Sequence, residues 1–215
     1  MEVHYNRTAQ KPAGKGISSA MTTDAAHSPG NPVTPIGRVL NSLLELLPTK
    51  LAKLWARQLS CEAGTKVVMP TRLYVGRGVT LQRRCLLHCG GKSWCDYEGS
   101  ITLGDHVVIG PNCVLYGAGV IRIGDYTHLG PGAMIMTQSG VVDDKSRFSL
   151  APARIHEAVE IGRGVWIGAG AVLVGGTRLG DGCTVSPNSV VSGEYGPGTT
   201  LVGNPARVAR THSVS

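Results

Sequence analysis

The chain has 215 residues, a formal net charge of +7 and 30 glycines but only one phenylalanine. Glycine at about twice its ordinary frequency, together with few aromatic residues, argues against a helical bundle and favours an all-β repeat with an aliphatic core. No Lys/Arg run with interleaved aromatic residues is present, which disfavours nucleic-acid binding, and no apolar run is long enough to cross a bilayer.

Residues 1–34 are predicted to be a disordered tail. They are polar, are broken by Pro and Gly, and show no apolar period. They also lack the apolar segment of a secretory signal. Because no secretory signal precedes the six cysteines, we interpret them as reduced thiols of a cytoplasmic protein.

Residues 35–60 are predicted to be a helical cap over one end of the repeat domain. Apolar residues recur there at helical spacing, at Val39, Leu40, Leu43, Leu44 and Leu47. Pro48 then breaks or kinks the run. The basic residues Lys50, Lys53 and Arg57 leave a membrane-surface helix open as the alternative.

Residues 61–203 follow a period of six, which neither a helix nor a flat strand requires. The aliphatic members of the clearest run are Ile161, Ile167, Leu173, Leu179, Val185 and Val191. Each hexad is interpreted as a short strand plus a corner, with the aliphatic residue pointing inward. Three hexads close one triangular coil, and coils stack at the strand spacing of about 4.8 Å. About six coils are expected, with interruptions near 88–100 and 138–158.

A cluster of possible metal ligands lies in the first interruption. Cys85, His88, Cys89 and Cys95 could chelate zinc, but their spacing matches no standard finger and no second half of a site follows. No metal site is therefore predicted.

The repeats resemble the left-handed parallel β-helix of hexapeptide-repeat acyltransferases, within the branch of galactoside, maltose and polysaccharide O-acetyltransferases. The matching segments are "ITLGDHVVIGPNCVLYGAGVIRIGDYTHLGPGAMIMT", "VEIGRGVWIGAGAVLVGGTRLGDGCTVSPNSVV" and "LVGNPARV". The resemblance covers about residues 66–210. The repeats themselves are predicted to end at residue 203 and to be followed by a C-terminal tail, residues 204–215. It implies a homotrimer with active sites between neighbouring prisms, and acetyl-coenzyme A as the donor.

The resemblance also implies residues that bind the coenzyme. A pantetheine channel would be lined by Gly130, Trp166, Ala169, Ser192 and Gly193. The guanidinium groups of Arg207 and Arg210 would lie near the coenzyme phosphates, which they suit by charge and fork geometry.

The chain departs from the branch at its catalytic histidine. The loop after the "IMT" strand reads Gln138–Ser139–Gly140 where the branch has a histidine. Transfer to a hydroxyl needs a base, and an imidazole is suited to this near neutral pH. We therefore predict His128 or His156 as the base. His128 and Trp166 occupy the same hexad position in consecutive coils and are expected to be neighbours on one outer face.

Two other functional classes stay open. The missing loop histidine would suit an inactive β-helix that serves as a binding or scaffold protein. A zinc carbonic anhydrase on the same prism would need three histidines that converge across a subunit boundary. His88, His106 and His128 fall on successive stretches, but their positions within the hexad differ. The acceptor is predicted to be a sugar or polysaccharide precursor, and its identity is unreadable from the sequence.

Overall fold

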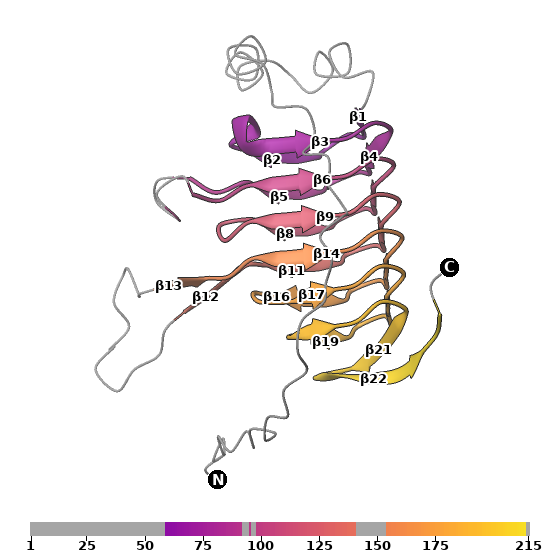
Figure 1. Ribbon diagram of the computed structural model, residues 1–215. Helices are drawn as coiled ribbons and strands as arrows, with labels where there is room; N and C mark the ends of the chain where they lie inside the picture. The colour runs from indigo at the N-terminus through magenta and orange to yellow at the C-terminus, as the bar shows by residue number, and fades with distance from the viewer. Residues whose placement is uncertain (1–58, 92–94, 96–97, 141–153, 214–215) are drawn as a thin grey trace, which may run out of the picture. The chain divides into compact units, whose positions relative to one another are not determined.

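The computed structural model describes residues 59–91, 95, 98–140 and 154–213. Successive short strands wind into stacked coils, and each of the six coils contributes one strand to each of three sheets (Figure 1). Neighbouring strands within these sheets pair in parallel, except at the last strand. The predicted all-β class and the parallel β-helix of hexapeptide repeats are confirmed.

Face A is the outer surface of the first sheet. Its strands, in spatial order, are β1 (Leu59–Cys61), β4 (Val79–Leu81), β7 (Val108–Ile109), β10 (His128–Leu129), β15 (Trp166–Ile167), β18 (Thr184–Val185), β21 (Thr199–Gly203) and β22 (Ala206–Thr211).

Faces B and C cover the other two sheets. Face B comprises β2 (Lys66–Val68), β5 (Leu86–His88), β8 (Val114–Tyr116), β11 (Met134–Met136), β16 (Val172–Val174) and β19 (Val190–Val191). Face C comprises β3 (Leu73–Val75), β6 (Ile101–Leu103), β9 (Ile121–Ile123), β14 (Val159–Ile161), β17 (Arg178–Leu179) and β20 (Glu194–Tyr195). A 3-10 turn, η1 (Pro70–Arg72), precedes β3.

The core is a set of columns of aliphatic side chains that run through the coils. Ile109, Leu129 and Ile167 lie in register on consecutive strands, and all three are fully buried. Each hexad therefore contributes one inward side chain to a continuous column. Burial of such side chains, worth about 1.5–3 kcal/mol each, stabilises the stack without aromatic residues.

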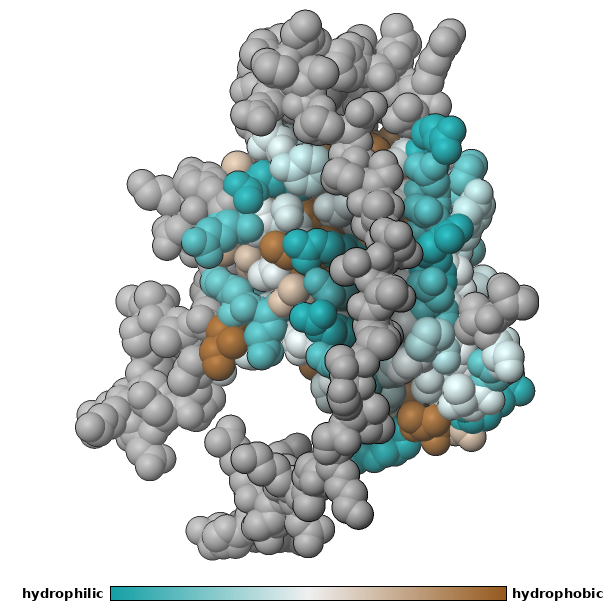
Figure 2. All heavy atoms as spheres, viewed as in Figure 1, coloured by the Kyte–Doolittle hydropathy of each residue, from teal (hydrophilic) through white to brown (hydrophobic). Residues whose placement is uncertain are grey.

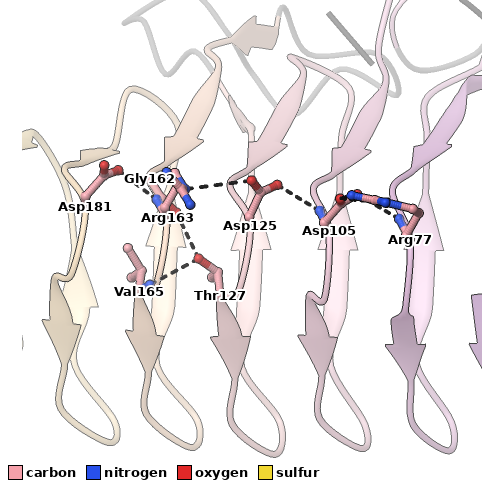
Figure 3. Close-up of polar contacts among 8 residues, drawn as sticks. All are labelled: Arg77, Asp105, Asp125, Thr127, Gly162, Arg163, Val165 and Asp181. Atoms are coloured by element: carbon pink, nitrogen blue, oxygen red, sulfur yellow. Dashed lines mark hydrogen bonds and ion pairs between the residues drawn. The ribbon is translucent and has the colours of Figure 1, made fainter. Parts of the chain in front are cut away.

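The corner between faces C and A is held by side chains that replace missing backbone partners. The Asp105 carboxylate accepts a 2.8 Å hydrogen bond from the Arg77 N–H of the preceding coil (Figure 3). One coil further on, the Asp125 carboxylate accepts a 2.8 Å hydrogen bond from the Asp105 N–H. The Thr127 hydroxyl donates to the Gly162 carbonyl at 2.8 Å and accepts from the Val165 N–H at 3.1 Å. These bonds tie consecutive coils together at the bend.

The three outer faces differ in chemistry. Face C carries an ion-pair ladder in which Glu160 pairs with Arg122 at 3.0 Å and with Arg178 at 2.8 Å. Face B instead presents half-buried apolar side chains in register, such as Met134 and Val172. Hydrophilic residues predominate on the described surface that Figure 2 shows. Because its outward side chains are mostly apolar and half-buried, face B is the apolar side of the prism.

Two predicted boundaries differ from the structure. Leu59 and Ser60, assigned to the helical cap, begin strand β1, and the rest of that cap lies outside the described residues, as does the tail 1–34. The segment assigned to a C-terminal tail contains β22, which pairs antiparallel with β21. The period of six could not show this pairing, because a returning strand does not follow the repeat.

Two further features bear on the sequence-based interpretation. All six cysteines lie within the described residues, where they are buried and form no disulfide. No helix in the described part of the chain has the length and apolar character that a bilayer crossing requires.

Candidate functional site

A histidine and a tryptophan form an aromatic pair on face A. His128 of β10 and Trp166 of β15 are paired in register on adjacent parallel strands. Their ring centroids lie 4.6 Å apart with the planes tilted by 34°, and Trp166 is 52% exposed. The predicted neighbourhood of these two side chains is confirmed. The imidazole is thereby placed on the surface beside a large apolar ring.

The corner that follows face A, called here the A/B edge, brings two of the predicted channel residues together. Gly130 follows β10, and Ala169 lies at the same corner one coil further on. A Cβ atom added at Gly130 would lie 2.7 Å from the Ala169 backbone nitrogen. Only glycine allows this approach. Gly130 and Ala169 follow the strands that carry His128 and Trp166, so all four residues lie at or beside the A/B edge.

Ser192 and Gly193 lie at a different corner, called here the B/C edge. They join β19 of face B to β20 of face C. Both are exposed, and Gly193 has φ 94°, a conformation that strongly favours glycine. The predicted channel residues are therefore not gathered on one edge of a single chain but are divided between two edges that flank face B.

His156 also belongs to the B/C edge, at the base of a projecting hairpin. β12 (Gln138–Gly140) and β13 (Arg154–His156) pair antiparallel, with Gln138 opposite His156 (Figure 1). The adjacent pair is closed by a 2.8 Å hydrogen bond from the Glu157 N–H to the Thr137 carbonyl. The Gln138–His156 pair is then non-hydrogen-bonded, the arrangement in which opposing side chains come closest.

Gln138 carries an unusual polar atom. Within the described residues its Oε1 is buried and has no hydrogen-bond partner. Leaving a buried acceptor unpaired costs about 1–3 kcal/mol, so such an atom calls for an explanation. In the sequence, Gln138 stands out only as the place where the histidine is missing, and no local signal marks its amide as functional.

The two arginines predicted to meet phosphates lie on β22, at the end of face A. Both are exposed. The Arg210 Nε donates to the Thr200 hydroxyl at 3.4 Å, and the Arg207 guanidinium donates to the Ala206 carbonyl at 2.9 Å. Neither forms an ion pair with a described acidic residue. Their positive charge is available to a ligand anion.

Within one chain, the three histidines of the zinc alternative lie at different places on the prism. His88 stacks on Tyr116 of face B at 5.4 Å, whereas His106 lies at the corner between faces C and A, and His128 lies on face A. The described residues contain no group of three or more potential metal ligands from His, Cys, Asp and Glu. Burial raises the pKa of the Cys89 thiol to about 12, which opposes the thiolate form that metals bind.

Comparisons with known proteins agree with a parallel β-helix built from hexapeptide repeats. Residues 158–193 match the family described as bacterial transferase hexapeptide (six repeats). Nodulation protein L of Rhizobium meliloti is 38% identical over 114 residues, which is 53% of this chain and 61% of that protein. The chain thus spans less than two thirds of this relative's length. Several other curated relatives are named as putative or probable acetyltransferases.

Solved structures show the same fold. A hexapeptide-repeat-containing acetyltransferase from Vibrio cholerae is 27% identical, with a TM-score of 0.53, and the match covers 81% of this chain and 89% of that chain. The same protein has also been solved with acetyl-coenzyme A. An N-acyltransferase from Bacillus cereus matches in fold, with a TM-score of 0.64, 16% identity and coverage of 78% and 89%. The resemblance to hexapeptide-repeat acyltransferases is confirmed.

Proposed function

We propose that the protein transfers an acetyl group from acetyl-coenzyme A to a hydroxyl, or an amine, of a sugar or polysaccharide precursor. The observation that carries this proposal is the pairing of half-buried His128 with exposed Trp166 beside the A/B edge, on a fold shared with a Vibrio cholerae acetyltransferase. The imidazole supplies a base, and the indole supplies a wall against which a pantetheine arm packs.

The proposed reaction runs through a ternary complex. His128 or His156 takes the proton of the acceptor hydroxyl while its oxygen attacks the acetyl carbonyl. Backbone N–H groups stabilise the oxyanion of the tetrahedral intermediate. The intermediate collapses as the carbon–sulfur bond breaks, and the departing thiolate regains the proton from the imidazolium. Holding both substrates in one complex supplies much of the rate.

The proposed assembly is a homotrimer, supported by the apolar face B and by the division of the site. In this trimer, three copies surround a three-fold axis and face B of each copy points toward the axis. The A/B edge of one copy then lies next to the B/C edge of its neighbour. Gly130, Trp166 and Ala169 of one copy would then meet Ser192 and Gly193 of its neighbour. The pantetheine channel would form between copies.

The charged end of the coenzyme is assigned to β22. Arg207 and Arg210 are exposed, and guanidinium groups pair with phosphate through two parallel hydrogen bonds. The six cysteines form no disulfide within the described residues, which supports the proposed cytoplasmic location because reduced cysteines persist there.

Release of free coenzyme A thiol tests this function. The full chain is incubated with acetyl-coenzyme A and a panel of sugars, nucleotide-sugars and amines. Alanine at the base, whether His128→Ala or His156→Ala, should lower turnover by about 10²–10⁴. Unchanged turnover in both variants would contradict the assignment of the base.

Melting temperature with and without acetyl-coenzyme A, compared with thiol release, distinguishes an active enzyme from a catalytically inactive scaffold. A protein that binds acetyl-coenzyme A gains about 2.7 kcal/mol of stability at a ligand concentration of 100 Kd. A rise in melting temperature with acetyl-coenzyme A but no thiol release from any acceptor would favour a binding protein. The absence of both effects would overturn the coenzyme assignment.

A further inference from the structure

One column of corner residues between faces C and A contains two aromatic side chains where glycine is the rule. Every position in this column has positive φ, and the members are Gly78, His106, Tyr126, Gly164, Gly182 and Gly198. His106 has φ 56° and Tyr126 has φ 58°. A bulky residue is strained in this region of backbone space, whereas glycine is not. Backbone conformations of this kind in bulky residues cluster at functional sites.

The two rings form a stack that leans toward the preceding coils. The His106 ring covers Gly78, since a Cβ atom added there would meet His106 Nδ1 at 2.6 Å. The Tyr126 ring lies on the His106 ring, with centroids 5.1 Å apart and planes 18° apart. Each ring thus rests on the residue one coil earlier in the column.

The outer face of the Tyr126 ring is left open by the coil that follows. The next member of the column is Gly164, and a Cβ atom added there would have no neighbour within 4 Å. Gly182 and Gly198 continue the column without side chains. Tyr126 is 60% exposed, the highest value among the exposed large hydrophobic residues described. Tyr126 thus presents an exposed aromatic face, called here the aromatic shelf, beside glycines that carry no side chains.

Charged groups lie at the same corner as this aromatic shelf. Arg163 precedes Gly164, and its guanidinium lies 3.7 Å from the Asp125 carboxylate (Figure 3). Asp181 of the next coil accepts a 2.8 Å hydrogen bond from the Arg163 N–H, and its side chain stays exposed. Carboxylates accept hydrogen bonds from hydroxyls, and a guanidinium donates them. An apolar ring face flanked by these groups fits a pyranose, which has an apolar C–H face and a rim of hydroxyls.

We propose that Tyr126, with Arg163 and Asp125, forms a saccharide-binding subsite. Tyr126 is two residues from His128, which limits their Cα separation to about 7 Å. At this separation a saccharide of two or more rings is long enough to stack on Tyr126 and to present a hydroxyl to His128. The link to His128 rests on the proposed acetyl transfer, whereas the subsite itself does not. The subsite selects acceptors of two or more sugar rings over monosaccharides.

The test measures saccharide binding without acetyl-coenzyme A. Maltose, maltotriose, chitotriose, glucose and N-acetylglucosamine are titrated by calorimetry into the full chain. A trisaccharide should bind the wild-type chain at least tenfold more tightly than its monosaccharide. Tyr126→Gly should weaken that binding at least tenfold, and Tyr126→Phe should stay within twofold. Tyr74→Ala removes an exposed tyrosine from face C and serves as the matched control, with binding unchanged.

Melting temperature separates a subsite from a merely structural stack. Glycine fits the backbone at 126, so Tyr126→Gly should melt at or above the wild-type temperature. A lower melting temperature with unchanged trisaccharide binding would overturn the proposal, as would no binding by any member of the panel. Tyrosine-dependent trisaccharide binding with no thiol release would uphold the subsite and overturn the proposed acetyl transfer.

Discussion

His128 and Trp166 hold the same place in consecutive coils, and their ring centroids lie 4.6 Å apart. The half-buried imidazole faces solvent on one side and the indole on the other. An aromatic neighbour restricts the motion of the imidazole without taking one of its nitrogens as a partner. The ring nitrogen that carries no proton can then accept a hydrogen bond from an acceptor hydroxyl, which makes this pair the centre of the predicted chemistry.

Trp166→Ala is expected to raise KM for acetyl-coenzyme A about tenfold, which corresponds to about 1.4 kcal/mol of lost binding. The indole is half exposed and offers a large apolar surface to the pantetheine arm. Initial rates at varied acetyl-coenzyme A measure the effect, and Trp166→Phe keeps most of the surface as the control. An unchanged KM in the alanine variant would exclude the indole from the channel.

Gln138→Leu tests the buried Gln138 Oε1, which lies on the strand opposite His156 and has no described partner. Removing a buried Oε1 that has no described partner should leave stability unchanged or raise it by about 1–3 kcal/mol. If the amide orients the imidazole for catalysis, turnover should fall about tenfold and its pH profile should shift. Urea unfolding and rates from pH 5 to 9 provide both measurements. Lower stability with an unaltered pH profile would mean that Gln138 has a structural role alone.

Sequence periodicity was sufficient to predict the coils and the face A pair, because both depend only on position within a hexad. It did not separate the two edges. The hexads on all three faces have the same pattern, and only a count of eighteen residues per coil assigns each to a face. Val191 follows Ile167 by one coil and one further hexad, so Ser192 falls on the edge after face B. The aromatic shelf was missed because Tyr126 breaks a glycine column that becomes evident only when coils are aligned.

Thr127→Val should destabilise the protein by about 1–3 kcal/mol. The side chain is fully buried, and its hydroxyl serves both the Gly162 carbonyl and the Val165 N–H. Valine has nearly the same shape but leaves both backbone groups unpaired. Urea unfolding at constant m-value measures the change. Thr127→Ser keeps the hydroxyl and should lose less, and equal losses in the two variants would contradict the hydrogen-bond explanation.

Acid sensitivity is expected to depend on Asp105. The Arg77 backbone N–H and guanidinium bond its carboxylate and hold the pKa below the ordinary 3.8. Because the unfolded chain binds this proton more readily, the stabilisation is present above about pH 4 and is lost as pH falls through the folded pKa. Asp105→Asn keeps an oxygen acceptor but cannot titrate. Its melting temperature should fall less than that of wild type between pH 7 and pH 3, and equal falls would remove Asp105 from the acid response.

Val172→Lys should dissociate the proposed trimer. Val172 lies on face B between Met134 and Val190, with which it pairs in register. Closure of face B around a three-fold axis would bury three like charges, and desolvation costs several kcal/mol for each. Light scattering coupled to gel filtration measures the mass of the assembly. Thr102→Lys places the same charge on exposed face C and should leave the assembly intact.

Dissociation also tests the composite site. If the A/B and B/C edges meet only between copies, the Val172→Lys monomer should lose thiol release while keeping its fold by circular dichroism. A wild-type monomer, or a trimer that survives Val172→Lys, would contradict the role of face B. A monomeric variant with full activity would instead show that one chain contains the whole site, since neither edge could then depend on a neighbouring copy.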